Sequence, residues 1–314
     1  MELLIFEVSN TKDRIRNREL NKPKGEVNMK QDRINLKGTL QQDNVFVNSE
    51  VRSLSQMTGL PTWKRLEKAI ISEGQIVNVV SGNYGHLPNE TFFTAVEEKL
   101  INADVNYLTR SINRENRSFA VDYILNDESF HINIKKGADK LKPMLRFTNS
   151  YDGSCKTSGH FGFYRELCSN GLHVANTNIG FSVRHTGSIS SVVLPEIGQL
   201  VEKFMDNEFY SLHKKFEVLA EKQITDLNEF VRITCEELKI FNFHSSEKNP
   251  DPSLNARIVI DTIKNESSIL KTAPNLWLGY NAFNEILHGK LKKSFEVQKQ
   301  MDSKLFNTIL EMAN

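Results

Sequence analysis

The chain has 314 residues, and 39% of them are hydrophobic, which is enough to bury a substantial core in one large domain or two ordinary ones. Its 40 lysines and arginines nearly balance 39 aspartates and glutamates, so the net charge excludes a general attraction to nucleic acid or membranes. Three cysteines exclude a dense disulfide framework and favour reduced thiols.

The N-terminal region contains a basic arm. Residues 11–37 carry nine lysines and arginines against four acidic residues, so this arm is either solvated or docks on phosphate groups or a neighbouring subunit. We assign residues 1–60 to this arm and a leading strand. The apolar run at residues 3–6 is too short for a signal peptide or a membrane span, so we expect a cytoplasmic protein without membrane contact.

Residues 61–190 are predicted to form an α+β sheet domain. Pro61 favours the start of a helix over residues 61–70, and a strand is expected at residues 74–82. Asn89 is a suitable N-cap for a helix over residues 90–101. Runs of β-branched and aromatic residues between polar turns then predict an antiparallel meander. Its strands are expected at residues 105–112, 118–125, 129–135, 143–151 and 154–167, with tight turns at residues 152–153 and 170–171.

Residues 191–314 form a predicted helical region, either separate or part of the same domain. Residues 243–253 are the best candidate for an internal linker. Strands followed by helices indicate the α+β class, with an antiparallel sheet in the first half packed with a helical second half. Helices are expected within residues 191–224, 225–241, 253–265, 275–289 and 295–313.

Residues 150–173, SYDGSCKTSGHFGFYRELCSNGLH, pair each of two cysteines with a histidine five positions later: Cys155 with His160, and Cys168 with His173. Zinc sites usually bring their ligands in as closer pairs, and strand positions five apart face opposite sides of a sheet. A nucleophilic cysteine would need a neighbouring base and a cationic setting. We therefore expect a hairpin with structural cysteines, and neither a metal nor a cofactor.

The chain lacks the GxxxxGK, HExxH and GxSxG motifs, which favours a binding protein over an enzyme. A metal-dependent nuclease that uses Asp251 and the carboxylate of the DTIK stretch, residues 261–264, remains an alternative.

Cations and aromatic residues alternate along the predicted hairpin. Single-stranded nucleic acid is bound by such surfaces, because cations follow the phosphates and rings stack on the bases. Phe161 and Phe163 share a strand face and are equally suited to the core. The predicted nucleic-acid-binding residues are Arg146, Tyr151, Lys156, Arg165, Asn170, Arg184 and His185.

Four fragments occur in order: NSYDGS from residue 149, YRELCSNGL from 164, VRHTGS from 183 and LWLGYNAFNEI from 276. Together they resemble a family of phage and plasmid proteins of unknown function, often found in prophages beside anti-restriction genes, over roughly residues 61–314. The basic arm, Cys155, His160 and His173 lie outside the resemblance. Its matching positions are Asn149, Asp152, Gly153, Arg165, Cys168, Asn170, Arg184, His185, Trp277, Tyr280 and Asn281.

The resemblance implies a mobile genetic element, a cytoplasmic site of action, and involvement with DNA or host defence. Gly153 has a structural role in its turn, whereas Arg165, Arg184 and His185 have no evident role in a core and are the expected functional residues.

Three hypotheses follow. The first is a homo-oligomeric phage or plasmid protein that binds single-stranded DNA and promotes annealing without a cofactor. The second is a counter-defence protein that binds and blocks a host immune component with the same surface. The third is a metal-dependent nuclease.

Overall fold

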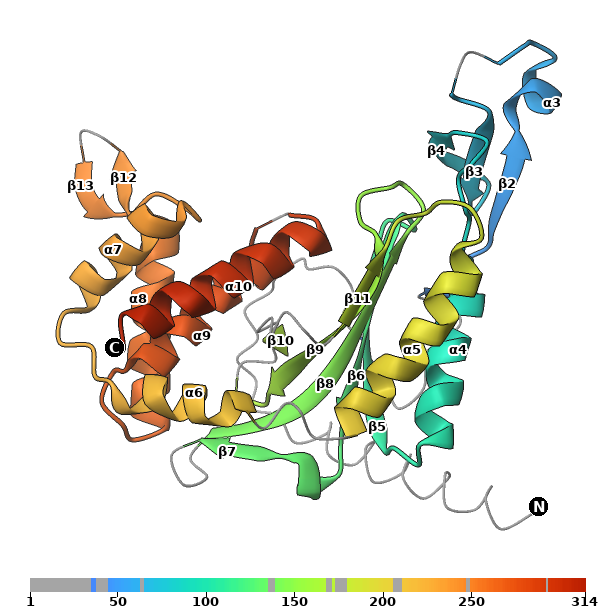
Figure 1. Ribbon diagram of the computed structural model, residues 1–314. Coiled ribbons are helices and arrows are strands. Elements are labelled where there is room, and N and C mark those ends of the chain that lie inside the picture. Colours follow the sequence, from blue (N-terminus) through green and yellow to red (C-terminus); the bar gives the residue numbers. More distant parts are fainter. Residues whose placement is uncertain are drawn as a thin grey trace.

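The fold is described from a computed structural model. It describes residues 35–37, 45–62, 65–134, 139–167, 171–172, 180–205, 211–246, 249–291 and 293–314. Most of the basic arm, Cys168, Asn170, His173 and the predicted turn at residues 170–171 therefore lie wholly or partly outside the described residues. Antiparallel sheets precede a series of helices along the chain, which confirms the predicted α+β class (Figure 1).

An antiparallel sheet of eight described strands forms the centre of the molecule. Its strands follow the order β1-β5-β6-β8-β9-β10, while β7 pairs with β8 and β11 pairs with β9. The predicted meander is confirmed for β5, β6, β8 and β9, whereas β7 pairs with β8 and not with β6. All eight residues of β6 are buried, because both faces of the sheet are covered. The strands are β1 Asn35–Lys37, β5 Tyr107–Arg114, β6 Ser118–Leu125, β7 Ile132–Ile134, β8 Asp139–Ser150, β9 Thr157–Arg165, β10 Gly171–Leu172 and β11 Gly180–Val183.

A smaller antiparallel sheet projects from one end of the central sheet (Figure 1). It contains β2 Ser49–Ser53, β3 Lys68–Ser72 and β4 Gln75–Val80, with the short helix α3 Leu54–Thr58 after β2. The predicted strand at residues 74–82 is thus confirmed, but the predicted helix over residues 61–70 is wrong, since Lys68 to Ile70 belong to β3.

The sequence signal for β3 is the tight turn that follows it. Glu73 and Gly74 both have positive φ, 48° and 77°, and Ser72 pairs with Gln75 across them. Two consecutive residues of this conformation form the hairpin turn that matches the twist of antiparallel strands. Ile70 and Ile71, both β-branched and buried, are well suited to the strand before it.

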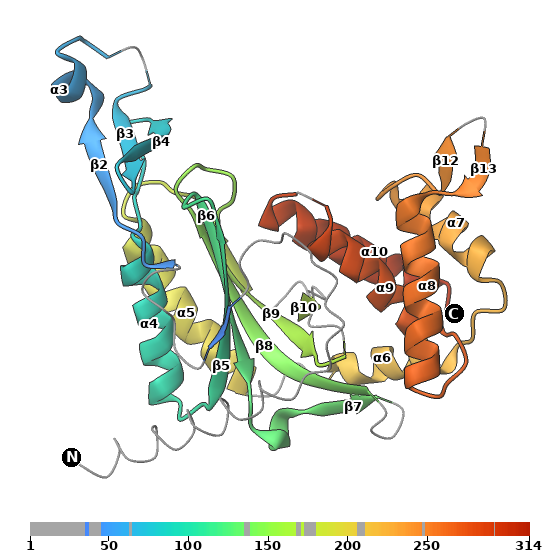
Figure 2. The same ribbon diagram turned by 180° about the vertical axis from the view of Figure 1, so that it is seen from behind.

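The long helices cover the two sides of the central sheet. Phe92 of α4 lies 6.0 Å from the Phe147 ring on β8, and Phe204 of α5 lies 5.6 Å from the Phe161 ring on β9. Figures 1 and 2 show α4 and α5 together along one side, while the later helices gather on the other. The helices are α4 Asn89–Asn102, α5 Ile189–Met205, α6 Ser211–Glu221, α7 Leu227–Leu238, α8 Leu254–Ile269, α9 Leu276–Gly289 and α10 Phe295–Glu311, with a 3-10 turn at Glu128–Phe130.

Side-chain caps explain where several of these helices begin. Side-chain caps precede four helices: Asp226 before α7, Ser253 before α8, Asn275 before α9 and Ser294 before α10. Each of these side chains accepts a hydrogen bond from a backbone N–H of the first turn.

The predicted linker at residues 243–253 forms a small hairpin, β12 His244–Ser246 and β13 Asn249–Pro252, and ends at the Ser253 cap.

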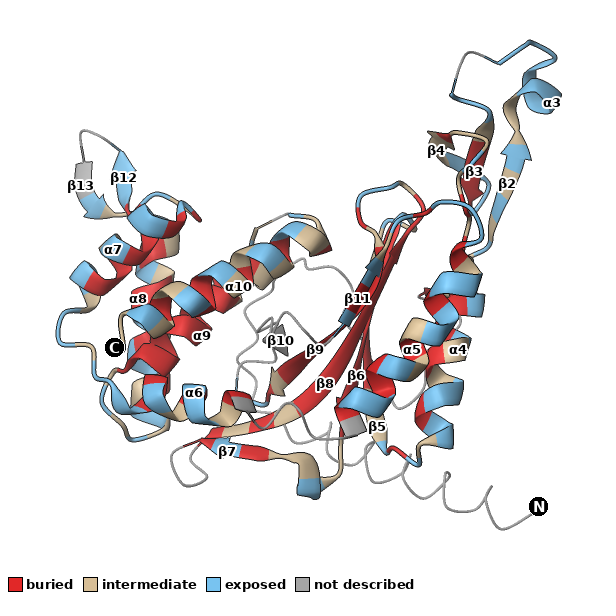
Figure 3. Cartoon of the chain, viewed as in Figure 1, coloured by how far each residue is buried: buried red, intermediate tan, exposed pale blue. Residues whose placement is uncertain are grey.

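The start of α10 packs against the end of the central sheet. Phe295 is buried with Ala120 of β6 and Cys155, and the Arg114 guanidinium lies 3.9 Å from the Phe295 ring. Arg114 also donates to the Lys293 carbonyl oxygen at 2.6 Å. Figure 3 shows buried residues along the strands and along the helix sides that face them, so sheet and helices share a core.

Gly159 of β9 sits where the core has no room for a side chain. A Cβ there would lie 2.6 Å from Phe181, 2.7 Å from Phe147 and 2.8 Å from Leu200. We expect Gly159→Ala to lower the free energy of unfolding by about 1–3 kcal/mol, because the core must be displaced around the added methyl group. Urea denaturation measures this loss.

The same substitution at Gly198, inside α5, is the matched control. A Cβ there meets only the end of the Lys99 side chain, at 3.8 Å. Gly198→Ala should therefore stabilise the protein by about 0.5–1 kcal/mol, since alanine is the better helix former. If both variants change stability in the same direction, the packing described around Gly159 is incorrect.

Candidate functional site

Two of the fragments that carry the resemblance meet at one end of the central sheet. Asn149 belongs to NSYDGS at the end of β8, and His185 belongs to VRHTGS after β11. Thr157, the first residue of β9, lies between them: its hydroxyl donates to Asn149 Oδ1 at 2.9 Å and lies 3.2 Å from His185 Nε2. All three side chains are buried.

Asn149 also ties the segment before α4 to the sheet. Its amide nitrogen donates to the Leu87 carbonyl oxygen at 2.9 Å and to Asn89 Oδ1 at 2.8 Å. The backbone N–H of Asn89 donates to the Tyr151 hydroxyl at 2.8 Å, and the Asn89 amide donates to the Val45 carbonyl oxygen. Asn89 is therefore a buried member of this hydrogen-bond network. The prediction that it is the N-cap of α4 is wrong, because Pro88 occupies the N-cap position and no side chain caps this helix.

His185 stacks on Tyr84. The two ring centroids are 5.2 Å apart and the planes differ by 3°. Burial lowers the pKa of His185 to about 4, so its imidazole is neutral near pH 7. The Tyr84 hydroxyl is buried and has no hydrogen-bond partner among the residues that the structure describes.

A hollow of about 410 Å³ opens beside this stack; we call it the tip pocket. Lys156, which is half-buried, and Arg184, which is exposed, both line it. Glu296 near the start of α10 contributes a carboxylate. The pocket thus combines an aromatic stack and two cations with one acidic group.

The connection between β8 and β9 forms one wall of the tip pocket, beginning at Gly153. Gly153 has φ of 74°, a conformation that other residues rarely adopt, as the sequence predicted for a tight turn. The half-buried Asp152 accepts a hydrogen bond from the Ser154 backbone N–H at 2.9 Å. Cys155 is buried next to the turn, and burial raises the pKa of its thiol to about 11, so it is not a thiolate at neutral pH.

Arg146 does not reach the tip pocket. The strand register sets Arg110, Asp122, Arg146 and His160 side by side across β5, β6, β8 and β9, on one face of the sheet. Arg146 Nη2 lies 2.7 Å and Arg110 Nε lies 2.8 Å from Asp122 Oδ2. All four residues are at most 5% exposed, so Arg146 is part of a buried ion triad and the prediction that it lies on an open surface is wrong.

A histidine and an aspartate on the C-terminal helices form a further buried polar group. His288 Nε2 of α9 lies 3.2 Å from Asp302 Oδ2 of α10, and the Tyr280 hydroxyl donates to Asp302 Oδ1 at 2.7 Å. Burial lowers the pKa of His288 although Asp302 opposes this, and Arg146 and Arg110 lower it further. These helices therefore present their polar groups towards the ion triad.

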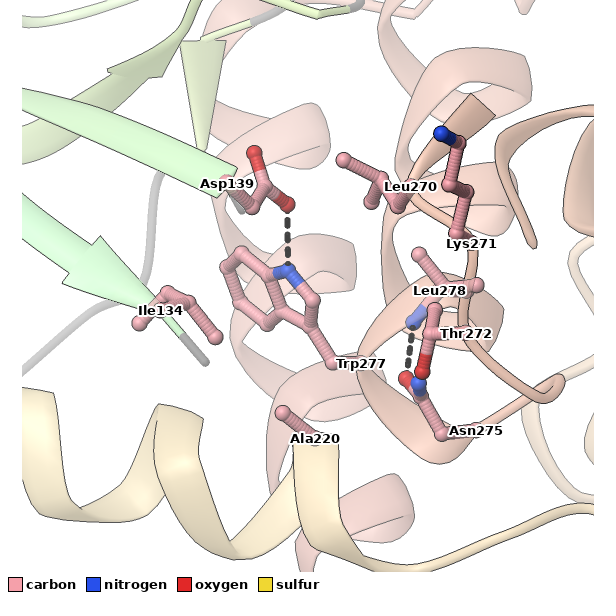
Figure 4. A pocket seen from close by; sticks show the side chains of 9 residues that line it. All are labelled: Ile134, Asp139, Ala220, Leu270, Lys271, Thr272, Asn275, Trp277 and Leu278. Atoms are coloured by element: carbon pink, nitrogen blue, oxygen red, sulfur yellow. Dashed lines mark hydrogen bonds between the residues drawn. The ribbon is translucent and has the colours of Figure 1, made fainter. Parts of the chain in front are cut away.

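Arg165 is also buried. It is fully inaccessible, and it donates to Asp139 of β8 and to Glu266 of α8 at 2.7 Å each. The Trp277 indole N–H of α9 donates to the same oxygen of Asp139 at 2.8 Å (Figure 4). Burial raises the pKa of Glu266, against the effect of Arg165. The fragments YRELCSNGL and LWLGYNAFNEI therefore meet at this ion cluster, which joins the sheet to the helices.

The predicted binding residues thus separate into three groups. Lys156, Arg184 and His185 come together at the tip pocket. Arg146 and Arg165 are buried, because β8 and β9 are covered on both faces where they lie, and Tyr151 is buried directly after β8 against Asn89. Asn170 lies outside the described residues, as does the matching position Cys168. Among the other matching positions, Trp277 and Tyr280 are buried hydrogen-bond donors, and Asn281 donates to the Trp277 carbonyl oxygen within α9.

Sequence reasoning missed Tyr84, Glu296 and the partners of the buried arginines. Tyr84 and Gly85 lie in a short irregular segment, and the Gly85 backbone N–H bonds to the His185 carbonyl oxygen at 3.2 Å. The sequence Tyr84, Gly85, His86 could have indicated this segment, because a glycine between an aromatic residue and a histidine is typical of a turn that carries functional side chains.

Neither a metal site nor a membrane span is found where the structure can be described. Within the described ranges, no three histidine, cysteine or acidic side chains are grouped so that they could hold a metal ion. In the same ranges, no helix is both long and apolar enough to cross a membrane.

Comparison with protein families places most of the chain in one domain. Residues 76–305 match the model of DUF932, a domain of unknown function. The match begins in β4 and ends in α10, so it includes the tip pocket, the ion triad and the Arg165 cluster. No curated protein and no solved structure matches the chain. The chain therefore belongs to the DUF932 family.

Proposed function

We propose that this protein binds single-stranded nucleic acid at the tip pocket. The observation that carries the proposal is the combination found there: two cations, Lys156 and Arg184, beside the stacked rings of Tyr84 and His185. Proteins that bind single strands without sequence preference combine the same two elements, a cationic path for phosphates and aromatic platforms for bases.

Each charged or aromatic group of the tip pocket has a role in the proposed binding. Lys156 and Arg184 contact the phosphates, and a base packs against the half-buried Tyr84 ring. Stacking on His185 holds the Tyr84 ring in place for this contact. Glu296 repels phosphate and accepts hydrogen bonds from exocyclic amino groups, so it keeps the backbone on the Lys156 and Arg184 side.

The proposal includes the biological setting that the resemblance implies. A phage or plasmid protein that holds single strands by their phosphates leaves base edges open, and complementary strands can then anneal without a cofactor. Assembly of several copies into a ring or filament would align many tip pockets along one strand.

Fluorescence anisotropy with labelled single-stranded oligonucleotides tests the proposal. The double variant Lys156→Ala, Arg184→Ala should bind about tenfold more weakly or worse, a loss of at least roughly 1.4 kcal/mol. Because each phosphate contact releases counterions, the slope of log K against log salt should also become shallower by about 1.4.

Lys214→Ala, Lys215→Ala on α6 is the control, since both lysines are exposed and the change in net charge is the same. Equal binding by the two double variants, with unchanged folding, would remove the tip pocket from the proposal. Absence of single-strand binding by the wild-type protein at low salt would favour the counter-defence alternative. Magnesium-dependent cleavage of the oligonucleotide would favour the nuclease alternative.

A further inference from the structure

A second cavity lies between the central sheet and the C-terminal helices, beside the Arg165 cluster (Figure 4). Its volume is about 190 Å³. Its walls are largely apolar: Ile134 comes from β7, Ala220 from α6 and Leu278 from α9. For comparison, an engineered apolar cavity of about 150 Å³ holds benzene. The space therefore suits a molecule much smaller than a nucleotide.

A buried carboxylate lines this cavity, and only one of its two oxygens accepts hydrogen bonds from the described residues. Asp139 is 4% exposed, and both Arg165 Nε and Trp277 Nε1 donate to its Oδ2 atom. The further contact from Arg165 Nη2, at 2.7 Å, is to Oδ2 as well. Oδ1 receives no hydrogen bond from the described residues. Oδ1 is not one of the buried atoms that lack a partner, so this oxygen is accessible, and a ligand donor in the cavity can reach it.

The charged groups around the cavity also indicate what charge its ligand carries. Arg165 pairs with two carboxylates, Asp139 and Glu266, so the ion cluster beside the cavity has one acidic group in excess, and Lys271 adds a cation at the exposed edge of the cavity. The Trp277 indole adds an aromatic wall, which attracts cations through its ring. Lys271, whose side chain is exposed, stands among the residues that line the cavity after the end of α8.

We propose that this cavity binds a small molecule that carries a protonated amine on a short apolar body. The ammonium group donates to Asp139 Oδ1, and the apolar body packs against Ala220, Leu278 and the Trp277 ring. An alkylamine and an apolar amino acid share this chemistry. They differ in the carboxylate, for which Lys271 is the cation among the lining residues. The proposal is independent of nucleic acid binding at the tip pocket.

Isothermal titration calorimetry of the full chain, with butylamine, valine and 1-butanol as the probes, tests this inference. Saturable binding of butylamine or valine, with none of the uncharged butanol, is the expected result. Lys271→Ala should weaken valine binding and leave butylamine binding unchanged if the ligand is an amino acid.

Two variants test the site itself. Asp139→Asn removes the charge and should weaken amine binding at least tenfold, but it also alters the Arg165 cluster. Ala220→Leu leaves that cluster intact and fills the cavity, so it should abolish binding while the protein stays folded. No saturable binding of either amine at millimolar concentration, or binding that persists in Ala220→Leu, would overturn the proposal.

Discussion

Replacing Asp122 with alanine is expected to lower the free energy of unfolding by about 3–5 kcal/mol. Asp122 is fully buried and contacts both Arg110 and Arg146, which are themselves about 95% buried. Without the carboxylate, the two guanidinium groups remain close together in the core. Their mutual repulsion is then no longer compensated by Asp122, which destabilises the folded state. Chemical denaturation followed by circular dichroism measures the loss.

The loss should also depend on pH. Burial on its own would raise the pKa of Asp122, but Arg146 and Arg110 outweigh it and hold the pKa well below its usual range. A depressed folded-state pKa means that this stabilisation is complete above the unfolded value of about 3.9 and decreases as the pH falls towards the folded value. The difference between wild type and Asp122→Ala should therefore be constant above about pH 5 and shrink below about pH 4.

Asp261→Ala on the exposed side of α8 is the control, and it should change the stability by no more than about 0.5 kcal/mol. If Asp122→Ala were as stable as this control, the ion triad would not be buried as described.

Replacing Arg165 with methionine should cost about 3–5 kcal/mol as well, because Asp139 and Glu266 would lose their shared cation. Burial already raises the pKa of Glu266, so protonation of this group relieves part of the penalty, more so at acidic pH. Arg184→Met makes the same chemical change at an exposed position and should leave stability within about 0.5 kcal/mol of wild type.

This pair of variants separates folding from binding. Thermal denaturation should show a large loss for Arg165→Met only, whereas single-strand binding by the folded fraction should fall for Arg184→Met only. A stable Arg165→Met variant with weakened binding would return Arg165 to the binding surface, contrary to its position in the core.

Local sequence patterns predicted the class of the fold because they report on short-range geometry. The strands from β5 to β9 have β-branched and aromatic runs, and the helices from α7 to α10 have apolar residues at helical spacing. The helix predicted over residues 61–70 failed because Pro61 also fits a loop that is followed by a strand. There the turn at Glu73 and Gly74 was the better signal.

The candidate site was harder to predict, because alternation along a strand shows which residues share a face but not whether that face is covered. Arg165 is paired with Glu266, 101 residues later, and no local pattern contains that contact. Arg146 is likewise matched by Asp122 on a neighbouring strand. In contrast, the turn at Gly153 depends on adjacent residues only, and the sequence predicted it.

Photo-cross-linking is the most direct test of the tip pocket as the nucleic-acid site. The wild-type protein would be irradiated with single-stranded oligonucleotides that contain 5-bromodeoxyuridine, and the adducts located by mass spectrometry. We expect adducts on Tyr84 or within residues 184–186, and we expect them to be lost in Lys156→Ala, Arg184→Ala under conditions where that variant no longer binds. Adducts confined to other surfaces, with none at the tip pocket, would contradict it.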